Sequence, residues 1–336
     1  MKNPVTYILS GLFFFTFSFL AAQDVTSGDG KSQVKDEIKN LSKTREVVIT
    51  VDDLPGAPVP EEIDLLKENT NKLLKWFRRS NIPAIGFVNE EKLYQEDKYI
   101  DQRAGVLKLW LDNGMELGNH TFSHSDINKT PLEEFKKDII KGEETVKRLL
   151  SEKGMKLRYF RHPFLHLGNT PEVKAALERF LSERGYTTAP VTIDNSEWIF
   201  AKAYLNAKQK GDEQMMKKIA GAYIPYMEQK FEYFEKQSVQ LFGREISQVL
   251  LIHANQLNAD YFGELAEMIK SRGYKFITLE EALKDTAYNS PDTYAKSGGI
   301  TWIHRWAITK GYKRDFFKGD PLTPEFVMKE AGVDEE

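Results

Sequence analysis

The sequence predicts an α/β protein, most economically a (β/α) barrel of about seven parallel strands with a helical insertion. Three observations support this fold class. Strand-like runs alternate with helical periods along most of the chain, which favours a parallel sheet with helices outside it. Ionisable residues stand where the strand-like runs end, as they do at the active-site face of such barrels. One stretch, 200–243, is too long for a plain crossover and is expected to form a helical insertion broken near Pro225.

The expected strands are short apolar runs bounded by polar or turn-forming residues. They occupy residues 46–51, 84–88, 115–119, 158–161, 187–193, 249–253 and 274–278. The helices between them carry apolar residues at helical spacing. After Pro60 such a face consists of Ile63, Leu66, Leu73 and Phe77, and after Thr130 it consists of Leu132, Phe135, Ile139, Val146 and Leu149.

The composition is that of a globular protein. The chain has 336 residues, a formal net charge of −3, 41% hydrophobic and 29% charged residues, and no cysteine. These values exclude intrinsic disorder, a collagen-like repeat and a disulfide scaffold. Because Lys+Arg (47) and Asp+Glu (50) nearly balance, there is no electrostatic case for nucleic acid as a partner.

Residues 1–23 have the pattern of a secretory signal peptide, with Lys2 followed by an apolar stretch over 7–20 and then by Ala21 and Ala22. An uncleaved membrane anchor is the alternative, but the apolar stretch is short for a bilayer span. We therefore expect an exported protein, periplasmic or secreted, without stable membrane insertion after the signal is cleaved.

The rest of the chain is expected to contain one folded domain. Residues 24–44 are polar and rich in Gly, Ser and Lys, which predicts a flexible leader. The folded domain is expected over 45–312, with the helical insertion at 200–243. A C-terminal tail is expected over 313–336, and its acidic end, 333–336, is expected to be solvated.

Ionisable side chains follow five of the expected strands. In a parallel barrel these strand ends converge on one face, where active sites are built. The residues concerned are Asp52 and Asp53, His120 with His124 four positions on, Arg161, Asp194 and His253. The sequence therefore predicts a catalytic site at this rim.

His120 and His124 are candidate metal ligands. Their spacing places both imidazoles on one face if the segment is helical, and a carboxylate from another strand would complete a three-ligand site. That carboxylate is either Asp52 or Asp53, whose side chains take different directions if the following Leu54-Pro55-Gly56 kinks the strand end. Two alternatives are ordinary packing of the histidines and a non-haem iron site.

Five segments together resemble the motifs of the polysaccharide deacetylases, carbohydrate esterase family 4. They read TVDDLP, GNHTFSH, FRHPF, VTIDNSEW and LLIH, in the family's order between residues 47 and 279. The resemblance implies a distorted (β/α) barrel, a glycan substrate and hydrolytic removal of acetyl groups from N-acetylated amino sugars. It implies that a divalent metal, Zn²⁺, is held by Asp53, His120 and His124. It assigns the catalytic base to Asp52 and the catalytic acid to His253.

The resemblance also implies roles for residues around this centre. Arg161 would orient Asp52, and Asp194 would lie near His253 or Arg161. The backbone N–H of Phe164 would help to hold the oxyanion. The pocket around the acetyl methyl group would be shaped by Trp198 and Leu251.

Four positions depart from the family pattern. Ala254 and Glu197 each replace a usual Asp, and His162 and Leu165 replace a usual Pro and Gly. None belongs to the expected ligand set or acid–base set, so we expect these departures to change the substrate rather than the chemistry.

Three other functions remain open at this point. The same scaffold would serve an O-acetyl esterase or a small-molecule amidohydrolase. A glycan-binding protein with a relic site would lack a ligand or the base, and the sequence lacks neither. The segment 298–312 carries two tryptophans that would suit sugar rings, but burial against the barrel is the expected role.

Overall fold

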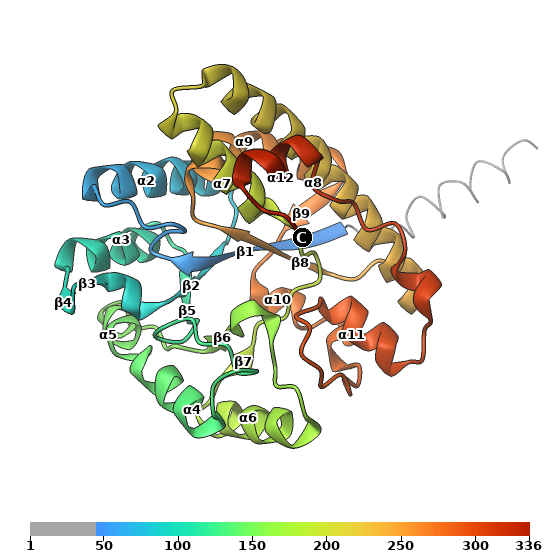
Figure 1. Ribbon diagram of the computed structural model, residues 1–336. Helices are drawn as coiled ribbons and strands as arrows, with labels where there is room; N and C mark the ends of the chain where they lie inside the picture. The colour runs from blue at the N-terminus through green and yellow to red at the C-terminus, as the bar shows by residue number, and fades with distance from the viewer. Residues whose placement is uncertain (1–44) are drawn as a thin grey trace, which may run out of the picture. The chain divides into compact units, whose positions relative to one another are not determined.

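The computed structural model describes residues 45–336 (Figure 1). The expected signal peptide, 1–23, and leader, 24–44, lie outside the described residues. A parallel seven-stranded sheet forms the centre of the described part. Its strands are β1 (Arg45–Leu54), β2 (Ile85–Val88), β5 (Glu116–Asn119), β6 (Tyr159–Phe160), β7 (Thr187–Thr188), β8 (Gln248–His253) and β9 (Tyr274–Phe276). Each of the seven expected strands is present.

The sheet curls until its two edges meet. The strand order is β7-β6-β5-β2-β1-β8, and β9 pairs with the first half of β1. Just after β7, the Thr192 N–H donates to the Val249 carbonyl at 3.0 Å, and the Leu251 N–H donates to the Ile193 carbonyl at 3.2 Å. This bridge joins the β7 edge to β8, and the predicted distorted (β/α) barrel is confirmed.

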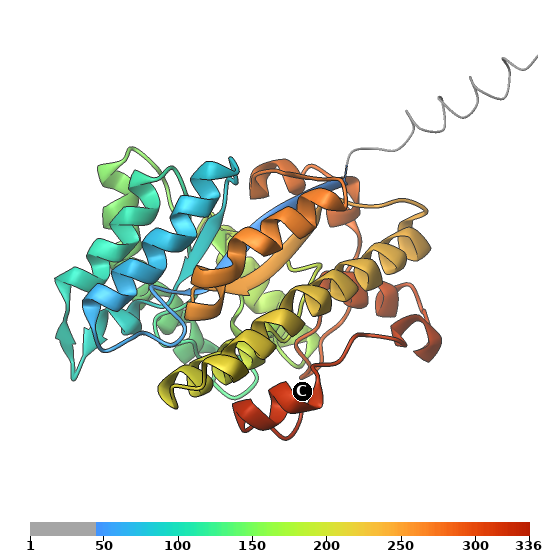
Figure 2. The ribbon, with the colours of Figure 1, turned by 90° about the horizontal axis from the view of Figure 1, so that it is seen from above.

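Helices surround the sheet, as Figures 1 and 2 show. They are α2 (Ile63–Arg79), α3 (Asp101–Asp112), α4 (Leu132–Lys141), α5 (Glu144–Glu152), α6 (Pro171–Glu183), α7 (Glu197–Gln209), α8 (Glu213–Phe242), α9 (Gln256–Ser271), α10 (Leu279–Ala282), α11 (Trp302–Thr309) and α12 (Glu325–Ala331). A small hairpin of β3 (Tyr94–Gln95) and β4 (Lys98–Tyr99) lies outside the main sheet. Among residues 45–336, no helix combines the length and the apolar character that a membrane span requires.

Apolar packing between β1 and its covering helices forms the core. Phe77 of α2 makes edge contacts with Trp110 of α3 at 5.8 Å and with Phe262 of α9 at 4.8 Å between ring centroids. All three side chains are fully buried. Aromatic side chains bury the most apolar surface per residue, so this contact fixes the helices over the sheet.

The insertion breaks at a different place from the one expected. Pro225 lies inside the continuous helix α8, and the chain turns instead at Gly211, whose φ of 70° is in the left-handed region that ends helices. A proline inside a helix costs about 3 kcal/mol. Burial of the neighbouring Tyr223, Tyr226 and Met227 offsets this cost.

The C-terminal segment packs onto the barrel more fully than the sequence indicated. Helix α12 lies against α7 (Figure 1). The Glu336 carboxylate accepts hydrogen bonds from the Ser196 hydroxyl and, at 2.8 Å, from the Thr323 N–H. The side chain of Glu336 is therefore held by contacts that the sequence did not indicate, while Asp334, Glu335 and Glu336 are exposed, as expected for a solvated end. Trp302 and Trp306 are buried, as expected for the segment 298–312.

Gly142 separates α4 from α5 and generates a prediction about stability. A Cβ added there would lie 2.6 Å from the Thr121 carbonyl carbon and 2.7 Å from the Phe122 nitrogen, which are backbone atoms with little room to move. We expect Gly142→Ala to lower the free energy of unfolding by about 1–3 kcal/mol because the site would be overpacked. Chemical denaturation measures this change.

Gly105→Ala is the matched control. Gly105 is exposed on α3, and an added Cβ meets no atom within 4 Å. Alanine is the better helix former, so this variant should gain up to about 1 kcal/mol. Equal changes in the two variants would contradict the close approach at Gly142.

Candidate active site

The strand ends bring the expected residues to one pocket of about 1000 Å³. They reach it from five separate segments of the chain. The expected residues that line the pocket are Asp52, Asp53, His120, His124, Phe164, Asp194, Trp198, Leu251 and His253. Arg161 is fully buried and contacts Asp52.

Asp53, His120 and His124 present three candidate ligand atoms within 4.8 Å of one another. The Nε2 atoms of both histidines lie 3.6 Å from Oδ1 of Asp53. That oxygen is buried and has no hydrogen-bond partner in the described structure. A carboxylate oxygen and two imidazole nitrogens form a donor set typical of Zn²⁺ and related divalent ions, so these residues fit such an ion.

Both histidines are neutral and correctly oriented for this role. Nδ1–H of His120 donates to the Arg161 carbonyl at 2.7 Å, which leaves its Nε2 lone pair facing Asp53. Burial lowers the pKa of His120 to about 4. Burial and the neighbouring His120 lower the pKa of His124 to about 4. A neutral imidazole is the form that binds metal.

The two histidines do not meet by way of a helix. The segment after β5 is irregular, and Thr121 and His124 have φ values of 66° and 55°. The helical segment that would align the two rings through their spacing is therefore not formed, and the irregular backbone brings their ring centroids to 4.9 Å instead. Asp53 also has a positive φ of 69°, which turns its side chain away from the alternation of β1.

Within the described residues, one carboxylate oxygen of Asp52 is hydrogen-bonded and the other is not. Its Oδ2 accepts a hydrogen bond from Nη1 of Arg161 at 3.1 Å, while its buried Oδ1 has no hydrogen-bond partner in the described structure. Arg161 is itself fixed by Ala189 O at 3.0 Å and by Thr50 Oγ1 at 2.9 Å.

Burial has the largest effect on the pKa of Asp52. It raises this pKa above its usual range, and the opposing effect of Arg161 is smaller. A carboxylate with a raised pKa is the stronger base, so the arrangement suits proton abstraction.

His253 is paired with a carboxylate that the sequence analysis set aside. Its Nδ1 lies 2.9 Å from Oε2 of the fully buried Glu197, whose Oε1 accepts from Asn255 and from Asn258. Burial lowers the pKa of His253, but Glu197, Asp53 and Asp52 raise it more, to about 9. The signal that was available is the position of Glu197 directly before Trp198 at a strand end.

Three other expected residues lie around this centre. Asp194 adds negative charge near Arg161 and His253, but in residues 45–336 it makes no direct hydrogen bond to either. Phe164 has a φ of 56° and is 53% exposed, and its ring centroid lies 4.4 Å from that of His124. Trp198 is half-exposed and Leu251 is nearly buried, and both line the pocket.

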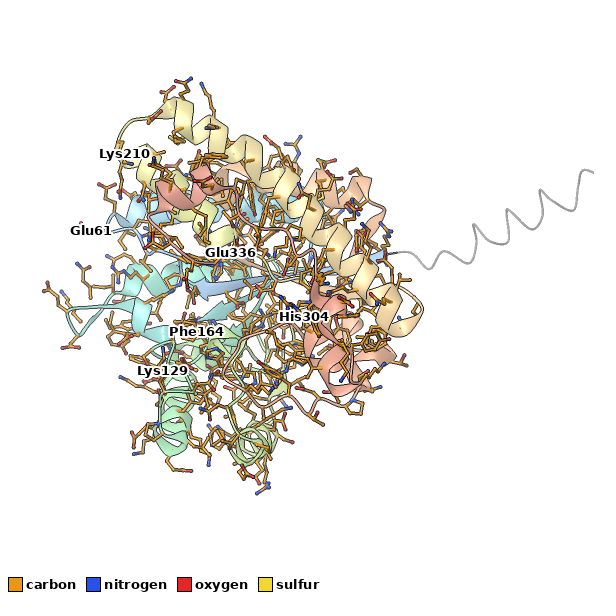
Figure 3. All side chains as sticks on the ribbon, turned by 45° about the vertical axis from the view of Figure 1, so that its right-hand side comes forward. Glu61, Lys129, Phe164, Lys210, His304 and Glu336 are labelled. Carbon is orange, nitrogen blue, oxygen red and sulfur yellow. The ribbon has the colours of Figure 1, made fainter. Side chains whose placement is uncertain are left out.

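Segments late in the chain complete the pocket wall. Lys230 of α8 and His304 of α11 line it, as do Asp320 and Glu336 from the expected tail. Figure 3 labels Phe164, His304 and Glu336, which approach the pocket from three different parts of the chain. Sequence analysis missed this wall because no motif marks it.

Comparison with known proteins identifies a family model that matches part of the chain. Residues 39–180 match the sequence model of the family described as polysaccharide deacetylase. A peptidoglycan-N-acetylglucosamine deacetylase of Bacillus cereus is 26% identical over 153 residues, which is 46% of each chain. A chitin deacetylase of Colletotrichum lindemuthianum is 22% identical over 246 residues, or 72% of this chain and 81% of that one. The chain thus spans less than half the length of the first of these relatives.

Solved structures of the same family are also similar. A pseudoenzyme of carbohydrate esterase family 4 from Bacillus anthracis is 15% identical with a TM-score of 0.47, over 72% of this chain and 66% of that one. A family 4 carbohydrate esterase from Streptomyces lividans in complex with acetate is 18% identical with a TM-score of 0.43, over 71% and 95%. The match over residues 39–180 confirms the resemblance predicted from the motifs and places that segment in the polysaccharide deacetylase family.

Proposed function

We propose that this protein is a metal-dependent hydrolase that removes acetyl groups from N-acetylated amino sugars of a poly- or oligosaccharide. One observation carries the proposal. A three-ligand donor set, a buried carboxylate with a free oxygen and a protonated histidine share one pocket. The family match over residues 39–180 supports it.

The metal ligands in this proposal are Asp53, His120 and His124. A bound divalent ion, for which we propose Zn²⁺, supplies Lewis acidity that polarises the acetyl carbonyl and acidifies the attacking water. Asp52 takes the proton from that water through its free Oδ1, while Arg161 holds the other oxygen in place. The raised pKa of Asp52 makes it an effective base.

His253 is the proposed acid. It is protonated below about pH 9 and delivers its proton to the leaving amine, which is a poor leaving group without one. The Phe164 N–H is the proposed donor to the oxyanion, and Trp198 and Leu251 shape the space for the acetyl methyl group. Asp194 supports the charge balance between Arg161 and His253.

We also propose export to the periplasm or the medium, where glycan substrates of this class lie. The relatives named above are deacetylases of peptidoglycan and chitin, which supports an envelope or extracellular glycan as substrate. The pattern of residues 1–23 supports the same location.

Acetate release tests the function directly. The protein is incubated with Zn²⁺ and either chitin oligosaccharides or peptidoglycan fragments, and acetate is measured. Acetyl esters and cyclic amides in the same panel test the esterase and amidohydrolase alternatives. Acetate release from the esters alone would replace the proposed N-deacetylation, and no turnover of any substrate would contradict an enzymatic function.

The ligand assignment predicts loss of metal in two variants. His120→Ala and His124→Ala should each lose bound zinc and activity, because two protein ligands rarely hold a catalytic ion. Elemental analysis of the purified variants measures the zinc content. His166→Ala is the control, since His166 pairs with Asp126 at 2.7 Å and is outside the donor set. Full zinc content in either test variant would show that the ligands are wrongly assigned.

Added metal should distinguish the roles of the two adjacent aspartates. Asp52→Asn leaves the ligand set intact, so it should keep the ion and lose about 10²–10⁴ in turnover, the usual contribution of a general base. Asp53→Asn should bind the ion more weakly because an amide is the poorer ligand, and excess metal should partly restore turnover. Zinc content is measured beside acetate release in both. Rescue of Asp52→Asn alone would exchange the two roles.

Glu197 should set the alkaline limit of activity. Glu197 raises the pKa of His253, so the acid keeps its proton until the pH rises through about 9. In Glu197→Gln the His253 pKa falls, and the alkaline decline of kcat should move to lower pH by about one unit or more. Glu336→Gln is the control, because it also removes a carboxylate from the pocket wall but one that forms no hydrogen bond with His253 in the described structure. It should leave the alkaline decline of kcat at the same pH. If the alkaline decline of kcat stays at the same pH in Glu197→Gln, the assignment of His253 as the catalytic acid is wrong.

A further inference from the structure

Lys92 contacts the proposed metal ligand Asp53 through a different oxygen from the one that faces the histidines. Its Nζ lies 3.1 Å from Oδ2 of Asp53, 3.3 Å from the Asp53 carbonyl and 3.5 Å from the Gly56 carbonyl. Within residues 45–336, Asp53 is the one carboxylate with which Lys92 forms an ion pair. Lys92 therefore joins both the side chain of Asp53 and the turn that follows it.

The backbone of Lys92 is fixed in place from several directions. It belongs to a 3₁₀ turn, Glu90–Leu93, that follows β2. Its carbonyl accepts from Nη1 of Arg103 at 3.1 Å. The buried carboxylate of Glu90 accepts from the first N–H groups of α5, at 3.0 Å from Thr145 and 2.8 Å from Val146. These bonds fix the backbone from which the Lys92 side chain extends to Asp53.

The contacts divide the two oxygens of Asp53 between different partners. Oδ2 is paired with Lys92, whereas Oδ1 is buried, has no hydrogen-bond partner in the described structure and lies 3.6 Å from each histidine Nε2. A carboxylate with both oxygens free is able to bind a cation through either or both of them. Here only one oxygen remains for the cation.

We propose that Lys92 is a positioning residue that reserves one oxygen of Asp53, so that Asp53 binds the divalent ion through a single oxygen and with reduced affinity. This inference rests on the proposed metal site. The reduced affinity follows because an ammonium group and a divalent cation share one carboxylate and repel each other. The Lys92 side chain is 26% exposed, so water screens this repulsion only in part.

Metal affinity tests the proposal without any measurement of activity. Zn²⁺ dissociation constants of the full chain are measured by competition with a chromophoric chelator. Lys92→Met removes the ammonium group and should bind Zn²⁺ about tenfold more tightly, because the repulsion is lost and both oxygens of Asp53 become available. Lys92→Arg keeps the charge and should stay within about twofold of the wild type.

Co²⁺ substitution supplies a second readout. The d–d absorption of Co²⁺ weakens as the coordination number rises, so two-oxygen binding by Asp53 in Lys92→Met should reduce the band. Lys202→Met is the matched control, since Lys202 lines the same pocket but within residues 45–336 forms no ion pair or hydrogen bond with Asp53. It should alter neither the affinity nor the spectrum. Lys92→Gln also removes the charge, and it repeats the test if Lys92→Met fails to fold.

The outcomes separate this inference from the proposed function. Wild-type protein that binds no Zn²⁺ overturns both the metal site and the inference. Wild-type binding with unchanged or weaker affinity in a folded Lys92→Met overturns the inference alone, as does an unaltered Co²⁺ spectrum. Equal tightening in Lys202→Met would assign the effect to the general charge of the pocket and would also overturn it.

Discussion

The register between β1 and β8 is the constraint on which the site depends. Parallel pairing sets Asp52 beside His253 and Thr50 beside Leu251. Because side chains alternate along a strand, Thr50 and Asp52 share a face, and on β8 Leu251 and His253 do the same. A slip of one residue would send the proposed base to the opposite face of the sheet from the acid. Burial of Val47, Ile49 and Val51 in the core fixes the register, so core packing sets the geometry of the proposed catalytic site.

The side chain of Asp53 must depart from the alternating directions of the β1 side chains. Such departures require strained backbone conformations, and these are concentrated at the site. Within residues 45–336, non-glycine residues with positive φ number eight, and five of them are Asp53, Thr121, His124, Phe164 and Leu165. Residues in sparsely populated backbone regions cost about 1–3 kcal/mol each and persist only where the surrounding structure over-determines them. The barrel supplies that support, because the Arg161 N–H donates to the Asn119 carbonyl and the His120 N–H to the Val88 carbonyl, both at 3.0 Å.

The sequence predicted the seven strands and the convergence of their ends, because apolar runs and the polar residues that follow them are local signals. Contacts between distant residues had no such signal. The pairs Glu197–His253 and Lys92–Asp53 each join residues more than 35 positions apart, and a lone Glu or Lys in a polar loop does not differ from a solvated one. The break at Gly211 was missed for a related reason, since Pro225 is a local helix breaker that burial overrides.

The two adjacent aspartates follow one charge pattern, which connects the fold to the proposed chemistry. Each has its Oδ2 beside a cation, Arg161 for Asp52 and Lys92 for Asp53, and each has a buried Oδ1 without a hydrogen-bond partner in the described structure. Two carboxylates so close together would repel each other unless cations paired with them. The negative charges of the two aspartates are balanced by Arg161 and Lys92. Glu197 likewise balances the protonated His253, and both ligand histidines are neutral. A divalent ion would then add positive charge to a locally balanced pocket, where it would stabilise the negative charge that develops as water attacks an acetyl carbonyl.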